Sequence, residues 1–224
     1  MVKDDYMLET QGLVVGYPGN PLLGPLNLRL RLGDVLIVFG PNGSGKTTLL
    51  KTLTGLRKPL QGRIICCGGE PRRTASFIYL VPETTTLPVS ITAEDYVKTI
   101  ALLYKADSES VEEALAIVDI PRKVLIAKLS QGQRRRLQLS TAIVVKKKVR
   151  FIAIDDPTVG LDDEGLPLLA DIVKNIKNYS AVVITSRENR LIELFHKEIP
   201  NTSVLHTDEL RYRATKQAIT RSTA

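Results

Sequence analysis

The sequence contains no tryptophan, two cysteines, two histidines and no long apolar run. Its longest uninterrupted apolar stretches have about five residues, such as residues 35–39, whereas a membrane-spanning helix needs about 20. The first residues, MVKDDYMLETQ, carry three acidic side chains and no apolar stretch after Lys3, which is unlike a secretory signal. We therefore expect a chain that does not cross a membrane and does not begin with such a signal.

The two cysteines, Cys66 and Cys67, are adjacent in a segment with the pattern of a strand. Because successive side chains of a strand point to opposite faces of the sheet, we expect small buried side chains and neither a disulfide nor a metal site. His196 and His206 do not have ligand spacing with the cysteines, which excludes a structural zinc site. So few cysteines also fit a reducing compartment.

The net charge is +7, and basic residues gather at 134–136, at 146–150 and from 211 onward. No aromatic residues are interleaved with these clusters, and no DNA- or RNA-reading motif is present, so no nucleic-acid partner is expected. We expect the clusters to form a solvated face. The alternative is a surface that faces a membrane or a partner protein.

The 224 residues, 43% of them hydrophobic, suit one domain of the α/β class over residues 1–224. Strand patterns fill residues 7–39 and return at 62–67 and 76–81, while residues 91–125 have helical periodicity. A further helix is expected to begin at Gln131, and strands then alternate with helices, which indicates a parallel sheet covered by helices. We predict a β core at about 1–90 and 140–224, interrupted by a helical lobe at about 91–139.

Residues 40–48, GPNGSGKTT, match the phosphate-binding pattern G-x-x-x-x-G-K-[ST] between an apolar strand and a helix. Glycines let backbone N–H groups curl around phosphate oxygens, and the start of the helix favours negative charge. We expect Lys46 to reach the β- and γ-phosphates and the Thr47 hydroxyl to ligate Mg²⁺. The predicted nucleotide-binding residues of this loop are Gly40, Pro41, Asn42, Gly43, Ser44, Gly45, Lys46, Thr47 and Thr48.

Two further motifs follow, LSQGQRRRLQLS at 129–140 and RFIAIDDPTVGLD at 150–162. In the first, Ser130 and Gln133 have the spacing of a capping box, which leaves N–H groups of the helix start free for an anion. In the second, a strand delivers Asp155 to the end of the sheet, where a carboxylate can hold Mg²⁺.

Together with the phosphate loop, these motifs resemble those of the ATP-binding cassette (ABC) transporter family, in the family's order and over about residues 7–207. The resemblance implies a P-loop NTPase core with a mostly parallel sheet, an N-terminal antiparallel β subdomain and an inserted helical subdomain. It also implies a subunit that binds and hydrolyses ATP with Mg²⁺ and drives transport through membrane-spanning permease subunits on other chains. Such a subunit is cytoplasmic and peripheral at the inner face of the cell membrane. The alternatives are a soluble ATPase of cofactor assembly and a slow or degenerate nucleotide sensor.

The resemblance also assigns roles to single residues. It implies that Ser130, Gly132 and Gln133 contact nucleotide held by a second subunit, so that ATP joins a head-to-tail homodimer or heterodimer. The family's usual signature is LSGGQ, and Gln131 stands here for one glycine. Asp162 ends a loop that contacts the other subunit. Tyr17 occupies the place of an aromatic residue that stacks on adenine; the alternative is an ordinary turn tyrosine.

Three positions depart from the family pattern. Asp156 replaces the glutamate that activates water, and its carboxylate is about 1.5 Å short of the usual reach, where a displacement of ~1 Å can cost ~10²-fold in rate. Glu83 replaces a glutamine that touches Mg²⁺ and water, and Ser186 or Arg187 replaces a histidine that bonds the γ-phosphate. The alternatives are that Asp156 caps a turn, that Glu83 is a solvated loop residue, and that neither Ser186 nor Arg187 touches nucleotide. Our hypothesis is that the chain binds MgATP well and hydrolyses it slowly, or works beside a more complete subunit.

Overall fold

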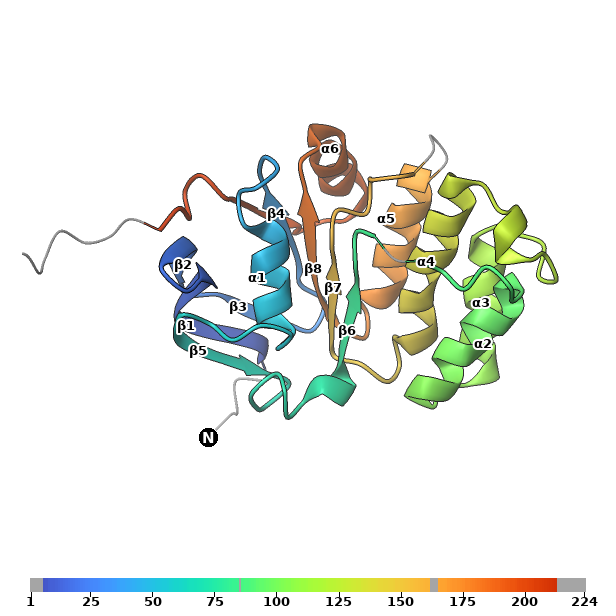
Figure 1. Ribbon diagram of the computed structural model, residues 1–224, viewed down its shortest axis with the longest axis horizontal. Coiled ribbons are helices and arrows are strands. Elements are labelled where there is room, and N and C mark those ends of the chain that lie inside the picture. The colour runs from blue at the N-terminus through green and yellow to red at the C-terminus, as the bar shows by residue number, and fades with distance from the viewer. Residues whose placement is uncertain (1–5, 85, 162–164, 213–224) are drawn as a thin grey trace, which may run out of the picture.

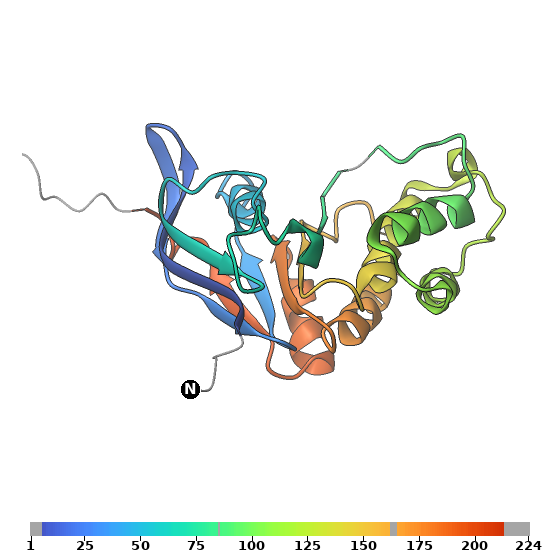
Figure 2. The same ribbon diagram turned by 90° about the horizontal axis from the view of Figure 1, so that it is seen from below.

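The structure is a computed structural model that describes residues 6–84, 86–161 and 165–212. An antiparallel sheet lies at one end of the molecule, a parallel sheet lies in the middle and a helical lobe lies at the other end (Figures 1 and 2). In the antiparallel sheet, β1 (Tyr6–Tyr17) pairs with β2 (Asn20–Leu26), β3 (Arg29–Arg31) and β5 (Gln61–Cys66). The predicted antiparallel β region at the N-terminus is confirmed.

The parallel sheet has the order β6-β7-β8-β4-β9. Its strands are β4 (Val35–Phe39), β6 (Ile78–Val81), β7 (Phe151–Ile154), β8 (Ala181–Ser186) and β9 (Ser203–His206), and every neighbouring pair is parallel. The carboxyl ends of β4, β6, β7 and β8 therefore meet at one edge. The phosphate loop, Glu83, the two aspartates and Arg187 follow these strands, so the fold brings the predicted site residues of the core to that edge.

Two hydrophobic clusters pack against opposite faces of the parallel sheet. In β4, Leu36 and Val38 join the cluster that contains α1 (Lys46–Leu53) and the antiparallel sheet. Val35 and Ile37 of the same strand join the cluster that contains α5 (Gly165–Ile176), α6 (Asn189–Glu198) and the lobe. Burial on both faces explains why the central strands are continuous apolar runs.

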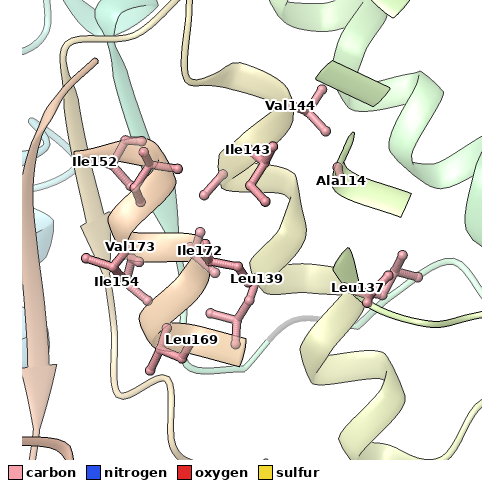
Figure 3. Close-up of a cluster of buried hydrophobic side chains, with 14 of the residues drawn as sticks. Ala114, Leu137, Leu139, Ile143, Val144, Ile152, Ile154, Leu169, Ile172 and Val173 are labelled. Carbon is pink, nitrogen blue, oxygen red and sulfur yellow. The ribbon is translucent and has the colours of Figure 1, made fainter. Parts of the chain in front are cut away.

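The lobe consists of α2 (Ala93–Tyr104), α3 (Ser108–Ile117) and α4 (Gln131–Val145), with the short 3₁₀ helix η2 (Ile126–Lys128) before α4. Another 3₁₀ helix, η1 (Ala75–Phe77), precedes β6. Thr92 caps α2 in a capping box with Asp95, and α4 begins at Gln131 as predicted. Helix α4 continues past residue 139, the predicted end of the lobe. Its buried side chains face α3 and α5, as the close-up of this cluster shows (Figure 3). Among the described residues, no helix is long and apolar enough to span a membrane.

Two expectations about side chains are wrong. Within the basic clusters, Arg135 and Lys146 are buried rather than solvated. Lys146 Nζ lies 2.5 Å from Glu113 Oε2 and 2.6 Å from Asn175 Oδ1, so its charge is paired inside the protein. The cysteines do not point apart, because β5 ends at Cys66 and their sulfur atoms lie 3.7 Å from each other.

Candidate nucleotide site

The phosphate loop lies between β4 and α1, and two of its glycines are sterically required. Gly45 is the N-cap of α1 with φ of 99°, in the left-handed region that favours glycine. At Gly40 a Cβ atom would lie 1.9 Å from the side-chain oxygen of Thr207. The Ser44 hydroxyl is buried and has no hydrogen-bond partner among the residues that the structure describes, which leaves it available to a ligand.

Lys46 opens α1 and is held at the loop. Its Nζ donates to the carbonyl oxygens of Gly40 at 2.8 Å and Pro41 at 3.0 Å. Burial lowers the pKa of Lys46, while the carboxylates of Asp156 and Asp155 oppose that shift. An ammonium group among backbone donors and a helix N-terminus is a suitable site for phosphate.

Asp155 follows β7 and connects three elements of the core. Its Oδ1 accepts hydrogen bonds from Thr47 Oγ1 at 3.1 Å and from Thr185 Oγ1 at 2.7 Å. The carboxylate and the Thr47 hydroxyl are hard oxygen donors beside the phosphate loop, so these residues fit a Mg²⁺ site. Thr185 is fully buried near the end of β8. Thr185 was not among the residues predicted from the sequence.

Asp156 is buried at the same edge with a left-handed backbone, φ of 34°. Its N–H donates to Thr185 Oγ1 at 2.8 Å, and its Oδ1 accepts from Thr158 Oγ1 at 3.1 Å. Burial raises the pKa of Asp156, while the Thr158 hydrogen bond and the charges of Lys46 and Arg187 oppose the shift. The carboxylate therefore stabilises the turn that contains Thr158, and it also lines the cleft.

Arg187, rather than Ser186, lies beside this carboxylate. Arg187 Nε is 4.0 Å from Asp156 Oδ2. Ser186 is fully buried, and its Oγ accepts a hydrogen bond from the N–H of Glu188 at 3.1 Å. The geometry thus favours the permanent charge of Arg187 over the Ser186 hydroxyl as the group available to a phosphate.

A cleft of about 510 Å³ opens at this edge, a size that suits a nucleotide. Tyr17 and Glu83 line it with the loop residues Asn42, Gly43, Gly45, Lys46, Thr47 and Thr48, the two aspartates and Leu22. Tyr17 is 47% exposed. The Arg57 guanidinium lies 4.1 Å from the centre of its ring, and Arg57 Nη1 donates to the carbonyl oxygen of Gly16 at 3.1 Å. Arg57, a residue that sequence analysis did not name, thus fixes the ring from one side.

The predicted capping box at the start of α4 is confirmed. Ser130 Oγ accepts from the Gln133 N–H at 3.1 Å, and Gln133 Oε1 accepts from the Ser130 N–H at 3.0 Å. Ser130, Gly132 and Gln133 begin α4, and none of them is among the described residues that line the 510 Å³ cleft. Gln131 lies beside Gly160, where a Cβ atom would be 3.3 Å from its Nε2. Asp162 lies outside the described residues.

Arg135, in the second turn of α4, is the residue that sequence analysis misjudged most. Its guanidinium donates to the carbonyl oxygens of Asp155 at 3.0 Å and Asp156 at 3.1 Å. It also donates to those of Pro82 at 2.7 Å and Pro157 at 3.3 Å, and to Gln138 Oε1 at 2.7 Å. Burial lowers the pKa of Arg135 to about 10, so it remains charged at neutral pH. The lobe is thereby fastened to the backbone that carries both aspartates.

Known proteins are similar to this chain in fold and in sequence. A family model described as ABC transporter matches residues 23–159, which is more than half of the chain. The cytochrome c biogenesis ATP-binding export protein CcmA of Alkalilimnicola ehrlichii is 36% identical over 191 residues, covering 81% of this chain and 80% of that protein. The SkfA peptide export ATP-binding protein SkfE of Bacillus subtilis is 32% identical, covering 70% of this chain and 68% of that protein.

A solved structure from Pyrococcus furiosus, assigned to the ATP-binding proteins of ABC transporters, matches with a TM-score of 0.80. Its sequence is 32% identical, and the match covers 92% of this chain and 99% of that one. The parallel core, the antiparallel sheet and the helical lobe described above are thus those of an ABC ATPase. The chain belongs to the ABC transporter family, as one of its ATP-binding subunits.

Proposed function

We propose that this subunit binds MgATP firmly in the 510 Å³ cleft, hydrolyses it slowly, and drives transport by closing head-to-tail on a second ATP-binding subunit. Lys46 and the loop N–H groups hold the phosphates, and Tyr17 stacks on adenine. Thr47 and Asp155 hold Mg²⁺, with Glu83 as a further oxygen donor, and the ion supplies charge neutralisation at the phosphates. The adjacent Thr47 and Asp155 oxygens support this assignment, as does the Ser44 hydroxyl, which has no hydrogen-bond partner within the described part of the chain.

The proposal of slow hydrolysis rests on Asp156. As the general base, Asp156 has to reach a water in line with the γ-phosphate, but its side chain is one methylene shorter than glutamate. It also accepts a hydrogen bond from Thr158 and lies beside Arg187, both close to its own turn. These contacts tie the carboxylate to its own turn, and a misplacement of ~1 Å can cost ~10²-fold in rate. Arg187 stabilises the γ-phosphate charge in place of histidine.

Dimer closure is the role that we assign to the lobe. Ser130, Gly132 and Gln133 lie at the N-terminus of α4 and are not among the residues that line the cleft of their own chain, and in our proposal they bind the γ-phosphate held by a second subunit. Asp162 joins this contact in our proposal. The second subunit is either an identical copy or a related chain with a complete set of hydrolytic residues.

The permease partners face the lobe and the segment from Glu83 to Val89 in our proposal, with the subunit at the cytoplasmic face of the membrane. Two of the similar proteins are named as export proteins, which supports an exporter over an importer. A soluble ATPase of cofactor assembly would instead be isolated with a soluble scaffold. Purifying the native complex from membranes with detergent distinguishes the two.

The rate proposal is tested with Asp156→Glu and Asp156→Asn, measuring ATP affinity and steady-state hydrolysis in parallel. We expect Asp156→Glu to raise kcat by up to ~10²-fold with unchanged ATP affinity, because only the reach of the carboxylate changes. Asp156→Asn is expected to abolish the residual rate and to leave binding intact. A wild-type kcat that Asp156→Glu does not raise would overturn the proposal, and a chain that binds but does not hydrolyse ATP even as Asp156→Glu would be a nucleotide sensor.

A further inference from the structure

Cys66 is the last residue of β5, and Cys67 lies in the two-residue turn that follows it. Cys66 and Gly69 form an antiparallel bridge, with N–H to O distances of 2.7 and 3.1 Å. Between them Cys67 and Gly68 have φ of 51° and 84°, and positive φ at both central positions defines a type I′ turn. A cysteine at the first central position is unusual, because glycine, asparagine and aspartate dominate there.

The turn brings the two thiols together and holds them. Because Cys67 leaves the strand, its side chain no longer alternates with that of Cys66, and the sulfur atoms lie 3.7 Å apart. The Cys67 N–H donates to the carbonyl oxygen of Met7 at 2.9 Å, and Thr74 Oγ1 donates to that of Cys66 at 2.9 Å. The dithiol is thus anchored by neighbouring segments before any ligand arrives.

The geometry favours a bridging atom over a disulfide. A disulfide needs sulfur atoms about 2.05 Å apart and Cα atoms usually at least about 4.4 Å apart. Consecutive residues have Cα atoms only about 3.8 Å apart, so a bond between these sulfurs has to strain the turn. One atom between two sulfurs at 3.7 Å needs no such contraction.

The surroundings restrict which atom that is. A structural zinc ion takes four protein ligands, and among the described residues no group of three or more histidine, cysteine, aspartate or glutamate side chains could hold a metal. A trivalent metalloid that carries one substituent of its own needs only two thiolates. We propose that Cys66 and Cys67 form a chelating dithiol site for one thiophilic trivalent metalloid, such as an organic arsenic(III) compound.

The reaction is a condensation without change of oxidation state. With an arsenic(III) oxide, R–As=O, both S–H bonds break, two As–S bonds form, and the oxygen leaves as water with both protons. Cys67 reacts first because it is partly exposed, whereas Cys66 is fully buried. The hydrogen bond from Cys66 lowers the pKa of Cys67, burial opposes that shift and Arg150 adds to it, and the net lowering favours the thiolate of the outer cysteine. Cys66 then closes the ring. At Gly68 a Cβ atom would meet nothing within 4 Å, so the arsenic substituent has room beside the turn.

The test uses the reduced full-length protein, phenylarsine oxide as the probe, and intact-mass spectrometry. We expect one adduct per chain that survives an excess of 2-mercaptoethanol and is removed by 2,3-dimercaptopropanol. Cys66→Ser and Cys67→Ser each leave one thiol, and each is expected to bind the probe ~10²-fold more weakly because the second bond is no longer intramolecular. Both variants should bind ATP normally, because Cys66 pairs with Leu8 while Tyr17 lies at the far end of β1.

Two results would overturn the inference. The first is a wild-type adduct that 2-mercaptoethanol removes as readily as it does from Cys67→Ser, which would mean that the thiols react separately. The second is loss of two hydrogen atoms from the wild-type mass in a glutathione disulfide buffer, together with failure to bind the arsenical. That outcome would make the pair a vicinal disulfide. Because Cys66→Ser puts a polar hydroxyl group in a fully buried position, Cys67→Ser is the variant that decides if Cys66→Ser does not fold.

Discussion

Replacing Arg135 by alanine tests whether its buried guanidinium group holds the lobe against the edge of the parallel sheet where Asp155 and Asp156 lie. The substitution removes one donor from each of four backbone carbonyl oxygens, those of Pro82, Asp155, Asp156 and Pro157. The oxygens of Pro82 and Asp156 keep a second donor, Gln138 Nε2 and the Val159 N–H, so the full loss falls on those of Asp155 and Pro157. At about 1 kcal/mol for each of these two buried carbonyls, the free energy of unfolding should fall by about 2 kcal/mol. For a chain of 224 residues, that corresponds to a fall in Tm of roughly 4–8 °C.

The matched control is Arg134→Ala. Arg134 also donates to two carbonyl oxygens, of Ile126 and Ala127, but from a partly exposed position where water replaces it, so a loss below about 1 kcal/mol is expected. Urea denaturation gives the two free energies. Arg135→Ala should also affect ATP hydrolysis more than ATP binding. We expect kcat to fall while ATP affinity changes little, because the phosphate loop is untouched. Equal stability of the two variants, with kcat unchanged in both, would refute the reasoning.

Three further predictions concern the cleft. Thr185→Val should cost about 1–3 kcal/mol in urea denaturation, because it leaves the Asp156 N–H without its partner and removes one of the two hydrogen bonds that Asp155 Oδ1 accepts, whereas Thr185→Ser should be milder. Tyr17→Ala should weaken ATP binding by about 1–3 kcal/mol, roughly 5- to 150-fold by calorimetry, and Tyr17→Phe should not. Burial raises the pKa of Asp156 above its unfolded value, so its ionisation costs stability as pH rises through the folded pKa. Asp156→Asn should therefore raise Tm at pH 7, and the gain should vanish when the pH falls below about 3.9, where the unfolded aspartate is also protonated; a gain that persists there would exclude this cause.

The sequence allowed prediction of the features that local spacing encodes. The phosphate loop, the capping box of Ser130 and Gln133 and the parallel strands each depend on residues close in the chain or on a simple period. Arg135 and Thr185 were missed for a physical reason. Apart from Gln138, which is near Arg135 in the chain, their partners are backbone atoms or a carboxylate 20 or more residues away. Neither composition nor local spacing indicates contacts of that kind.

The cysteine pair shows how one residue at an element boundary changes a conclusion. The strand expected over residues 62–67 ends at Cys66 instead. Side-chain direction alternates only inside a strand, so moving Cys67 into the turn converted two opposed side chains into neighbours. Boundaries of this kind are the least predictable part of a fold, because they depend on turn geometry and on contacts such as that from Cys67 to Met7.

Helix α4 is held to the core near its N-terminal end, so a small rotation about that end moves its other end much further. It has 15 residues and is therefore about 22 Å long, so a tilt of about 10° about the first turns moves its far end by about 4 Å. Arg135 holds those first turns to the carbonyl oxygens of Asp155 and Asp156. A second subunit that pulls on Ser130 must therefore either carry both aspartates with the helix or break these hydrogen bonds. Contact at the start of α4 and the position of the Asp156 carboxylate, our proposed general base, therefore change together.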